Sequence, residues 1–183
     1  MNEHEHHGHG VGGATGVEGR HFCINDGSRL TIHEIEDRPL EVCDRCGWVL
    51  WRDPKLATAT LVLDGDGELV LGRRATEPAY GEWCLPGGFV NDDEHPAVGA
   101  VRECREEIGC EVAVDRLLGA YHVPKVDAPS MVVLGYAAHL LDGAGPHPGP
   151  EMLETASFAL DRLPPLAFPS HREVLADWLA RRR

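Results

Sequence analysis

The spacing of glycine, proline and apolar residues between positions 86 and 110 places the tightest constraint on the fold. Pro86-Gly87-Gly88 is a turn signal, and from Pro96 onward the apolar residues recur at helical spacing. Proline suits the first position of a helix, and Gly109 suits the left-handed residue that often ends one. The pattern predicts a helix over residues 95–108, just after a glycine-rich turn. Its apolar stripe consists of Ala97, Ala100, Val101, Cys104 and Ile108.

Three carboxylates lie on another face of this predicted helix. Glu103, Glu106 and Glu107 are spaced i, i+3, i+4, so they project together across one turn. Such like charges repel by roughly tenths of a kcal/mol per pair on an exposed helix. A solvated acidic face is the ordinary interpretation of such a run. A glycine turn beside it lets backbone approach a ligand, and carboxylate oxygens are the ligands that Mg²⁺ prefers.

The rest of the chain predicts an α/β (α+β) fold. Two β-rich runs, residues 57–64 and 68–74, flank the turn Gly65-Asp66-Gly67 and predict a hairpin. Strands interrupted by one central and one terminal helix predict an α/β/α sandwich with a mixed sheet. The later predicted elements are strands over 111–123, 130–140 and 154–160, a Gly/Pro loop over 143–150, and a helix over 170–183 with Ser170 as N-cap.

The chain divides into three predicted regions. Residues 1–20 are rich in histidine and glycine without periodicity, so we expect a disordered tail. Its histidines either bind metal weakly or belong to a solvated tail: His4, His6, His7 and His9. Residues 21–56 contain few aliphatic residues and are too few to fold on an apolar core alone. Residues 57–183 are long enough for one complete domain.

Composition limits the partners. The formal net charge is −13 with histidines neutral, which argues against nucleic-acid binding but not against phosphorylated small molecules beside a bound cation. No stretch reaches the ~20 apolar residues of a membrane span. The N-terminus lacks the apolar core of a signal peptide, so we expect a cytoplasmic protein. Three of the six cysteines occupy apolar positions and are expected in the core: Cys84, Cys104 and Cys110.

The region around the predicted helix resembles a known family. Gly88, five residues, Glu94, seven residues and then residues 102–110 (RECREEIGC) match the Nudix box G-x5-E-x7-R-E-U-x-E-E-x-G-U. Cysteines occupy the two U positions, which are otherwise bulky and apolar. Residues 81–90 and 166–175 also resemble segments of Nudix pyrophosphatases that carry an N-terminal zinc ribbon. The resemblance covers about residues 21–180.

The resemblance implies a Mg²⁺-dependent (or Mn²⁺-dependent) hydrolase. Glu106 and Glu107 would bind the metal, the Gly87 carbonyl would complete its shell, and Glu103 would be a ligand or the base that activates water. Arg102 would hold a box glutamate in position. Two or more cations would polarise the pyrophosphate and lower the pKa of the attacking water.

Other residues would support this site. Glu94 would stabilise the loop, Gly88 would allow close approach, and Gly109 would end the helix. Glu151 or Glu154, beyond the Gly/Pro loop, would add a ligand or a base. The alternative for both is a plain loop carboxylate.

The resemblance also implies a zinc ribbon in residues 21–56. Cys43-x2-Cys46 is one knuckle, and Cys23 begins the other, where Asp26 stands in place of the usual second cysteine. Zn²⁺ accepts carboxylate oxygen, so a site of three cysteines and Asp26 is feasible. Two histidines are further candidates for the fourth ligand: His21 and His33. A ribbon that has lost its metal is the alternative.

The substrate is less constrained. Arg73 or Arg74 can contact phosphate, and Trp83 can stack on a base, although core packing is equally consistent with it. Two tyrosines are weighed in the same way: Tyr80 and Tyr121. The SQPWPFPxS-like segment of Nudix NADH pyrophosphatases is absent, and Pro124 lies roughly where ADP-ribose pyrophosphatases place a proline. These features rank ADP-ribose first, then FAD, NADH and nucleoside triphosphates.

Two other functions remain open at this stage. One is a catalytically silent Nudix ligand sensor, which the intact glutamates disfavour. The other is a zinc-ribbon nucleic-acid adaptor, which the negative charge disfavours. We expect a nucleotide-derived small-molecule substrate and, from the resemblance, a homodimer.

Overall fold

The computed structural model describes residues 14–125, 128–141 and 145–182. The chain forms two compact units, one ending at Asp53 and the other beginning at Pro54, and each is described by itself. None of the described helices is long and apolar enough to cross a membrane.

The first unit is a four-stranded antiparallel sheet in the order β1-β2-β3-β4. Its strands are β1 (Ala14–Phe22), β2 (Arg29–Ile35), β3 (Arg38–Val42) and β4 (Val49–Leu50). β1 includes residues 14–20, for which we expected disorder, because its backbone pairs with β2. The remainder of the expected tail, with its four histidines, lies outside the described residues.

The second unit is built on a mixed sheet in the order β10-β6-β5-β9-β8, with the short β7 paired to β6. β5 and β9 are parallel, and the other pairs are antiparallel. The strands are β5 (Lys55–Leu63), β6 (Leu69–Arg74), β7 (Trp83–Cys84), β8 (Val112–Val123), β9 (Met131–Leu140) and β10 (Met152–Phe158). The predicted hairpin at residues 65–67 is confirmed: Asp64 accepts the N–H groups of Asp66 and Glu68.

The central helix α1 (Pro96–Ile108) agrees closely with the prediction. Pro96 occupies its first turn, and the N-cap His95 accepts a hydrogen bond from Ala97 through its ring. Gly109 ends the helix with a φ of 65°, in the left-handed region.

The terminal helix α2 (Pro169–Ala180) starts earlier than predicted and ends earlier too. Ser170 is not the N-cap: Phe168 holds that position without a side-chain cap, and Pro169 begins the helix. The fixed φ of proline suits a first helical position, so the helix begins at Pro169 and Ser170 lies inside its first turn.

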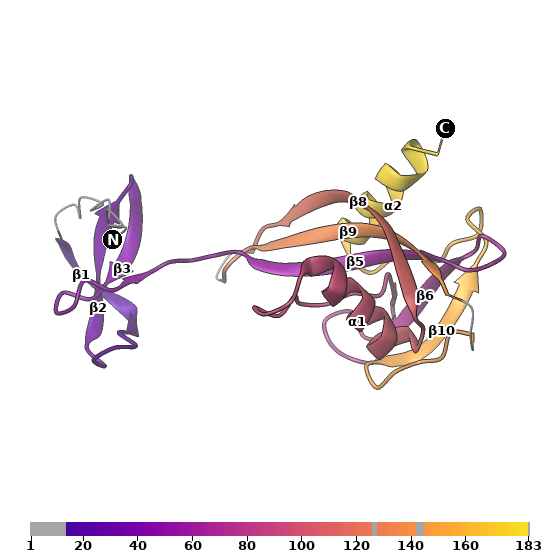
Figure 1. The fold of residues 1–183 in the computed structure, drawn as a ribbon. Helices are drawn as coiled ribbons and strands as arrows, with labels where there is room; N and C mark the ends of the chain where they lie inside the picture. The colour runs from indigo at the N-terminus through magenta and orange to yellow at the C-terminus, as the bar shows by residue number, and fades with distance from the viewer. Residues whose placement is uncertain (1–13, 126–127, 142–144, 183) are drawn as a thin grey trace, which may run out of the picture. The chain divides into compact units, whose positions relative to one another are not determined.

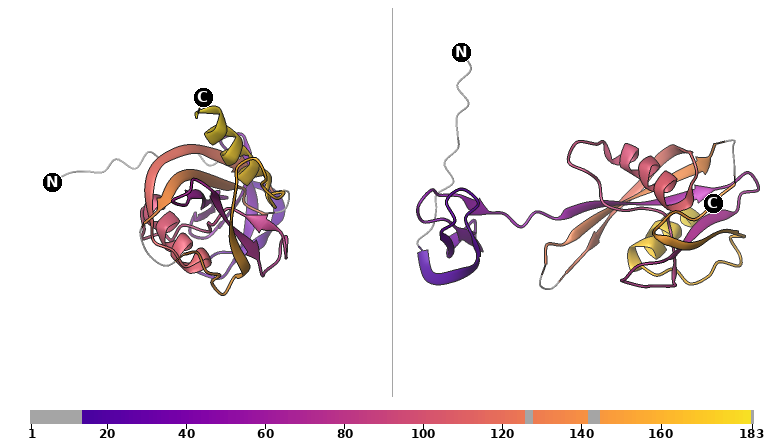
Figure 2. Two further views of the ribbon diagram at one scale, coloured as in Figure 1. Left: turned by 90° about the vertical axis from the view of Figure 1, so that its right-hand side faces the viewer. Right: turned by 90° about the horizontal axis from the view of Figure 1, so that it is seen from below.

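The two helices cover opposite faces of the sheet (Figures 1 and 2). Cys104 and Ile108 of α1 pack with Val62 on one face. Val174 and Trp178 of α2 pack on the other face, against the alternate residues of β5. The α/β/α sandwich is therefore confirmed, and the three cysteines predicted in the core are buried: Cys84, Cys104 and Cys110.

Candidate active site and candidate metal centre

The glycine turn is held against the open edge of β5. β5 pairs with β6 only at its last two residues, and residues 86–90 cover the preceding stretch. Thr58 N–H donates to the Gly88 carbonyl at 2.8 Å, and Thr60 N–H donates to the Pro86 carbonyl at 2.8 Å. These bonds fix the backbone of the turn beside α1.

Gly87 has a conformation that a side chain would prevent. Its φ is 155°, and a Cβ there would overlap the carbonyl oxygen of Thr58. Its N–H donates to Oε2 of Glu107 at 2.8 Å, on the side away from β5. The Pro86 and Gly88 carbonyls are occupied by β5, whereas the Gly87 N–H faces the helix carboxylate.

Arg102 holds the acidic face of α1 together. It binds both carboxylate oxygens of Glu94, at 2.6 and 3.1 Å. The third guanidinium nitrogen, Nη1, donates to Glu103 at 2.7 Å and to Glu106 at 3.0 Å, and Nη2, which also binds Glu94, donates to the Phe89 carbonyl. The hydrogen bond from Arg102 lowers the pKa of Glu94 to about 2. Arg102 therefore joins the loop that bears Glu94 to the helix and contacts two of the box glutamates.

Glu107 is an unusual carboxylate, since only 5% of it is exposed. Burial raises its pKa to about 8, against the smaller opposing effect of the Gly87 N–H. Burial also raises the pKa of Glu103. A bound cation would stabilise both carboxylates in their charged forms, because opposite charge offsets the cost of desolvation.

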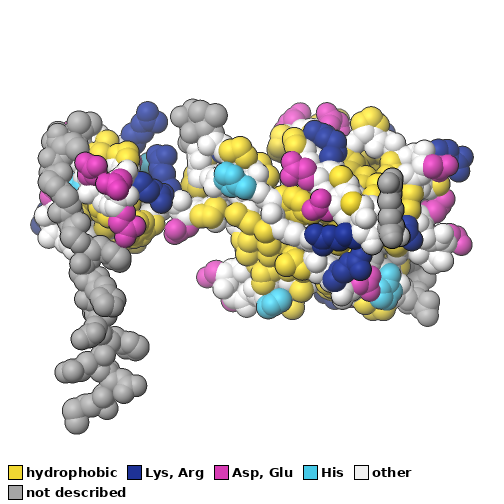
Figure 3. Space-filling view, turned by 90° about the horizontal axis from the view of Figure 1, so that it is seen from above, with side chains coloured by type: hydrophobic (Ala, Val, Ile, Leu, Met, Phe, Trp, Pro, Cys, Tyr) yellow, Lys and Arg dark blue, Asp and Glu magenta, His cyan; other side chains and the backbone are white. Residues whose placement is uncertain are grey.

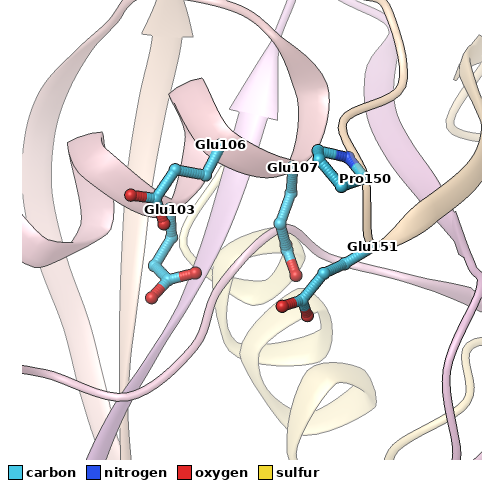
Figure 4. A pocket seen from close by; sticks show the side chains of 5 residues that line it. All are labelled: Glu103, Glu106, Glu107, Pro150 and Glu151. Atoms are coloured by element: carbon cyan, nitrogen blue, oxygen red, sulfur yellow. The ribbon is translucent and has the colours of Figure 1, made fainter.

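A cavity of about 260 Å³ lies beside these glutamates. It is lined by Glu103, Glu106, Glu107, Pro150 and Glu151. Figure 4 shows the Glu151 side chain facing those of Glu103 and Glu107 across the cavity. Four carboxylates around one small space are a donor set that fits Mg²⁺ or Mn²⁺.

The structure separates the two downstream candidates. Glu151 lines the cavity, whereas Glu154 lies on β10 opposite Arg73, with 3.5 Å between their charged atoms. Residues Gly149 and Met152 bracket Glu151 in a tight turn closed by a 3.1 Å hydrogen bond.

The residues predicted to contact substrate make hydrogen bonds or packing contacts within the protein. Arg73 donates to the Gly81 carbonyl, and Arg74 donates to the Pro78 carbonyl and to Thr76, so both brace the loop between β6 and β7. Trp83 packs edge-on against Phe158, with ring centroids 4.9 Å apart, beside the main core. The two tyrosines considered for base stacking differ in exposure. Tyr121 is buried and its hydroxyl donates to Asp177, whereas Tyr80 is exposed.

One residue near the site has no counterpart in the sequence analysis. His171 of α2 is 7% exposed, and its Nδ1 accepts the N–H of Leu85, two residues before Gly87, at 3.1 Å. Burial lowers the pKa of His171 to about 4, with smaller contributions from Arg74 and Arg172. A sequence separation of 86 residues left no local pattern from which to predict this contact.

The first unit contains two turns with the same backbone pattern. In one, Gly27 N–H donates to the Cys23 carbonyl, and in the other Gly47 N–H donates to the Cys43 carbonyl. Both glycines have a φ above 70°. Asp26 and Cys46 each precede the glycine, so Asp26 occupies the position that corresponds to Cys46.

These turns bring four possible ligands together. The ligand atoms of Cys23, Asp26, Cys43 and Cys46 all lie within 4.8 Å of one another. Cys23 Sγ is 3.5 Å from Cys46 Sγ, and Asp26 Oδ2 is 3.5 Å from Cys43 Sγ. A tetrahedral site with metal–sulfur bonds of about 2.3 Å requires separations of this size, so the cluster can hold a metal ion.

Neighbouring groups single out Asp26 as the fourth member. Ser28 donates to Asp26 Oδ1 through its N–H and its hydroxyl, which lowers the pKa of Asp26 to about 2 and leaves Oδ2 toward the cysteines. The two histidines considered as alternatives bind carboxylates outside the cluster: His21 with Glu41 and His33 with Asp44.

Comparison with known proteins agrees with this architecture. Residues 53–178 match the family model of the NUDIX domain. The NAD-capped RNA hydrolase NudC of Pseudomonas aeruginosa is 34% identical over 179 residues, which cover 94% of this chain. The chain spans 61% of that relative's length.

Two further proteins match over nearly their whole length. The ADP-ribose pyrophosphatase of Methanocaldococcus jannaschii is 31% identical over 89% of this chain and 93% of its own. The crystal structure of a NUDIX hydrolase from Nitrosomonas europaea superposes with a TM-score of 0.78 at 28% identity, covering 88% of this chain and 91% of that one. The family match, the box geometry and the α/β/α sandwich agree, and the chain belongs to the Nudix family.

Proposed function

We propose that this protein is a divalent-metal-dependent hydrolase that cleaves the pyrophosphate of a nucleoside diphosphate linked to another group. One observation carries the proposal: four carboxylates line one cavity, and one of them, Glu107, is almost completely buried. Such a cluster is stable when a cation neutralises it, and a cation there can in turn bind phosphates.

Mg²⁺ or Mn²⁺ would be held by Glu103, Glu106, Glu107 and the Gly87 carbonyl. Bound there, it would neutralise phosphate charge and lower the pKa of a water. Arg102 keeps Glu103 and Glu106 on the cavity side of the helix. Either Glu103 or Glu151 can accept the proton of an attacking water, because both face the cavity.

ADP-ribose is the first substrate to test. The support is the M. jannaschii relative, named an ADP-ribose pyrophosphatase, which this chain covers almost completely. FAD and NADH follow in rank. NAD-capped RNA is added to the substrates to be tested because one relative is the NAD-capped RNA hydrolase NudC, although the chain spans only 61% of that relative's length. On the face seen in Figure 3, basic side chains are interspersed with acidic ones, which suits a small substrate better than a long polyanion.

Zn²⁺ is the ion that we propose for the cysteine cluster. Three thiolates and one carboxylate are a donor set that zinc accepts. Its role would be to hold the two turns of the small unit together, because that unit has little apolar core of its own: Cys23, Leu30 and Cys43 form one cluster, and Ile35, Leu40 and Val42 form the other.

The test is a hydrolysis assay with Mg²⁺ or Mn²⁺ over ADP-ribose, FAD, NADH, nucleoside triphosphates and NAD-capped RNA. Glu106→Gln should lower kcat by about 10³-fold or more, since a charged metal ligand is lost. Glu111→Gln is the matched control, because Glu111 is exposed, pairs with Arg105 and does not line the cavity.

The outcomes separate the possible functions. Metal-dependent release of AMP and ribose 5-phosphate from ADP-ribose would support the proposal. Ligand binding without turnover of any substrate would favour a silent sensor. Selective RNA binding without hydrolysis would favour a nucleic-acid adaptor. Full turnover by Glu106→Gln with metal still bound would contradict the assigned site.

A further inference from the structure

The turn from Cys23 to Ser28 offers the metal cluster a carboxylate where the other turn offers a second thiolate. In this turn Cys23 Sγ accepts the N–H of Asn25, two residues further along, at 3.4 Å. Asp26 Oδ1 accepts the N–H of Ser28, also two residues further along, at 2.9 Å. A single sulfur atom can both bind a metal and accept such a bond, whereas a carboxylate can divide the two tasks between its oxygens.

Ser28 binds Asp26 Oδ1 in two ways. Besides its N–H, its hydroxyl donates to the same oxygen at 2.5 Å. The Ser28 backbone is itself fixed at the base of the turn, because its carbonyl accepts the Cys23 N–H at 2.8 Å. With Oδ1 held in this way, Oδ2 is the oxygen left for a metal ion, and it lies 3.5 Å from Cys43 Sγ.

The position of Asp26 Oδ2 suits a tetrahedral ion. Bonds of about 2.1 Å to oxygen and about 2.3 Å to sulfur place those two atoms about 3.6 Å apart in tetrahedral geometry. A competing cation is also close, since Arg45 Nε is 3.9 Å from Oδ2. Because the Asp26 side chain is 23% exposed, hydrogen bonds rather than packing must hold it against that guanidinium.

We propose that Ser28 is the positioning residue that makes Asp26 a one-oxygen ligand in place of a cysteine. This inference rests on the proposed zinc site. The Ser28 hydroxyl keeps Asp26 from rotating toward Arg45 and from offering both oxygens to one ion. It thereby completes a tetrahedral site of three thiolates and one oxygen. A cysteine at position 26 would need no such support, because its single sulfur atom leaves no second oxygen to restrain.

The test is a double-mutant cycle of Ser28→Ala and Asp26→Cys in the full chain, with Co²⁺ as the probe in oxygen-free buffer. The thiolate-to-cobalt absorption band reports only metal bound by cysteine, so Co²⁺ on histidines or on the Nudix carboxylates does not contribute. Ser28→Ala should weaken Co²⁺ binding about 10- to 100-fold and reduce the visible absorption typical of tetrahedral Co²⁺. In the Asp26→Cys background the same change should have little effect. Ser28→Thr, which keeps the hydroxyl, is the control and should bind as wild type does.

An equal loss in both backgrounds would mean that Ser28 acts through Cys43, whose Sγ lies 3.2 Å from the hydroxyl, and would overturn the inference. Unchanged affinity and spectrum in Ser28→Ala would overturn it as well. If Ser28→Ala alone does not fold, the double variant decides: it should fold and bind Co²⁺ as Asp26→Cys does, and its failure would count against the inference. A wild-type chain without cysteine-bound Co²⁺ would instead contradict the zinc site itself, and the inference with it.

Discussion

Replacing His171 by asparagine is expected to remove a pH-dependent part of the protein's stability. The Nδ1 atom of His171 accepts the buried N–H of Leu85, which precedes the Pro86–Gly88 turn. Protonation would place a second donor against that N–H and a charge in a buried position. Asparagine can still accept this hydrogen bond, but it does not titrate.

The size of the stability loss at low pH follows from the pKa of His171, which burial lowers to about 4 from an ordinary value of about 6.5. Above pH 6.5 the ring is neutral in both states, and its contribution is fully present. As the pH falls from 6.5 toward 4, the unfolded chain takes up the proton first and stability is lost. The loss is about 2 kcal/mol by pH 5 and approaches about 3 kcal/mol below pH 4.

The assay is urea unfolding of wild-type protein and of His171→Asn between pH 7.5 and 5.0. The difference between their free energies of unfolding should shift by about 2 kcal/mol over this range, because other titrating groups cancel. His122→Gln, at an exposed position on β8, is the control and should follow wild type. The reasoning would be refuted if the free energies of unfolding of wild type and His171→Asn differed by the same amount, within about 0.5 kcal/mol, from pH 7.5 to pH 5.0.

Three further predictions concern the turn, the small unit and the assembly. Gly87→Ala should abolish hydrolysis and cost about 1–3 kcal/mol, because its Cβ would overlap the Thr58 carbonyl, whereas Gly65→Ala should be neutral in the same activity and thermal-melting assays. Elemental analysis of protein lacking residues 1–13 should find one Zn²⁺ per chain, retained in Asp26→Cys and weakened in Asp26→Ala; zinc-free protein would leave a ribbon without metal. Light scattering should give twice the 20.0-kDa chain mass, and monomer alone at micromolar concentration would contradict the expected homodimer.

Local chemistry was sufficient to predict the elements that carry the site. Pro96 and Gly109 delimit α1 because the preferences of proline for a first helical position and of glycine for left-handed backbone act within a few residues. The spacing of the three box glutamates determines that they share a helix face, whatever surrounds them. The hairpin between β5 and β6 follows from its turn residues for the same reason.

Contacts between distant segments decided the rest. Glu151 and Glu154 are equivalent by sequence. Only the tertiary structure puts Glu151, before β10, in the cavity and Glu154, on β10, opposite Arg73. By sequence Trp83 is a candidate for base stacking, but in the fold its ring packs against Phe158. α2 starts at Pro169, one residue before the predicted N-cap Ser170, because proline suits a first helical position.

The burial of individual groups also belongs to the tertiary structure. The charge of Glu107 is plain in the sequence, but its raised pKa requires the loop and sheet that exclude water from it. His171 reaches Leu85 only because α2 packs across the same sheet that supports the turn. The sequence by itself determined which residues share a helix face or a turn, because those depend on short-range backbone geometry. Only the fold decided which of them are buried, paired or turned toward the cavity, because desolvation and long-range hydrogen bonds arise when distant segments meet.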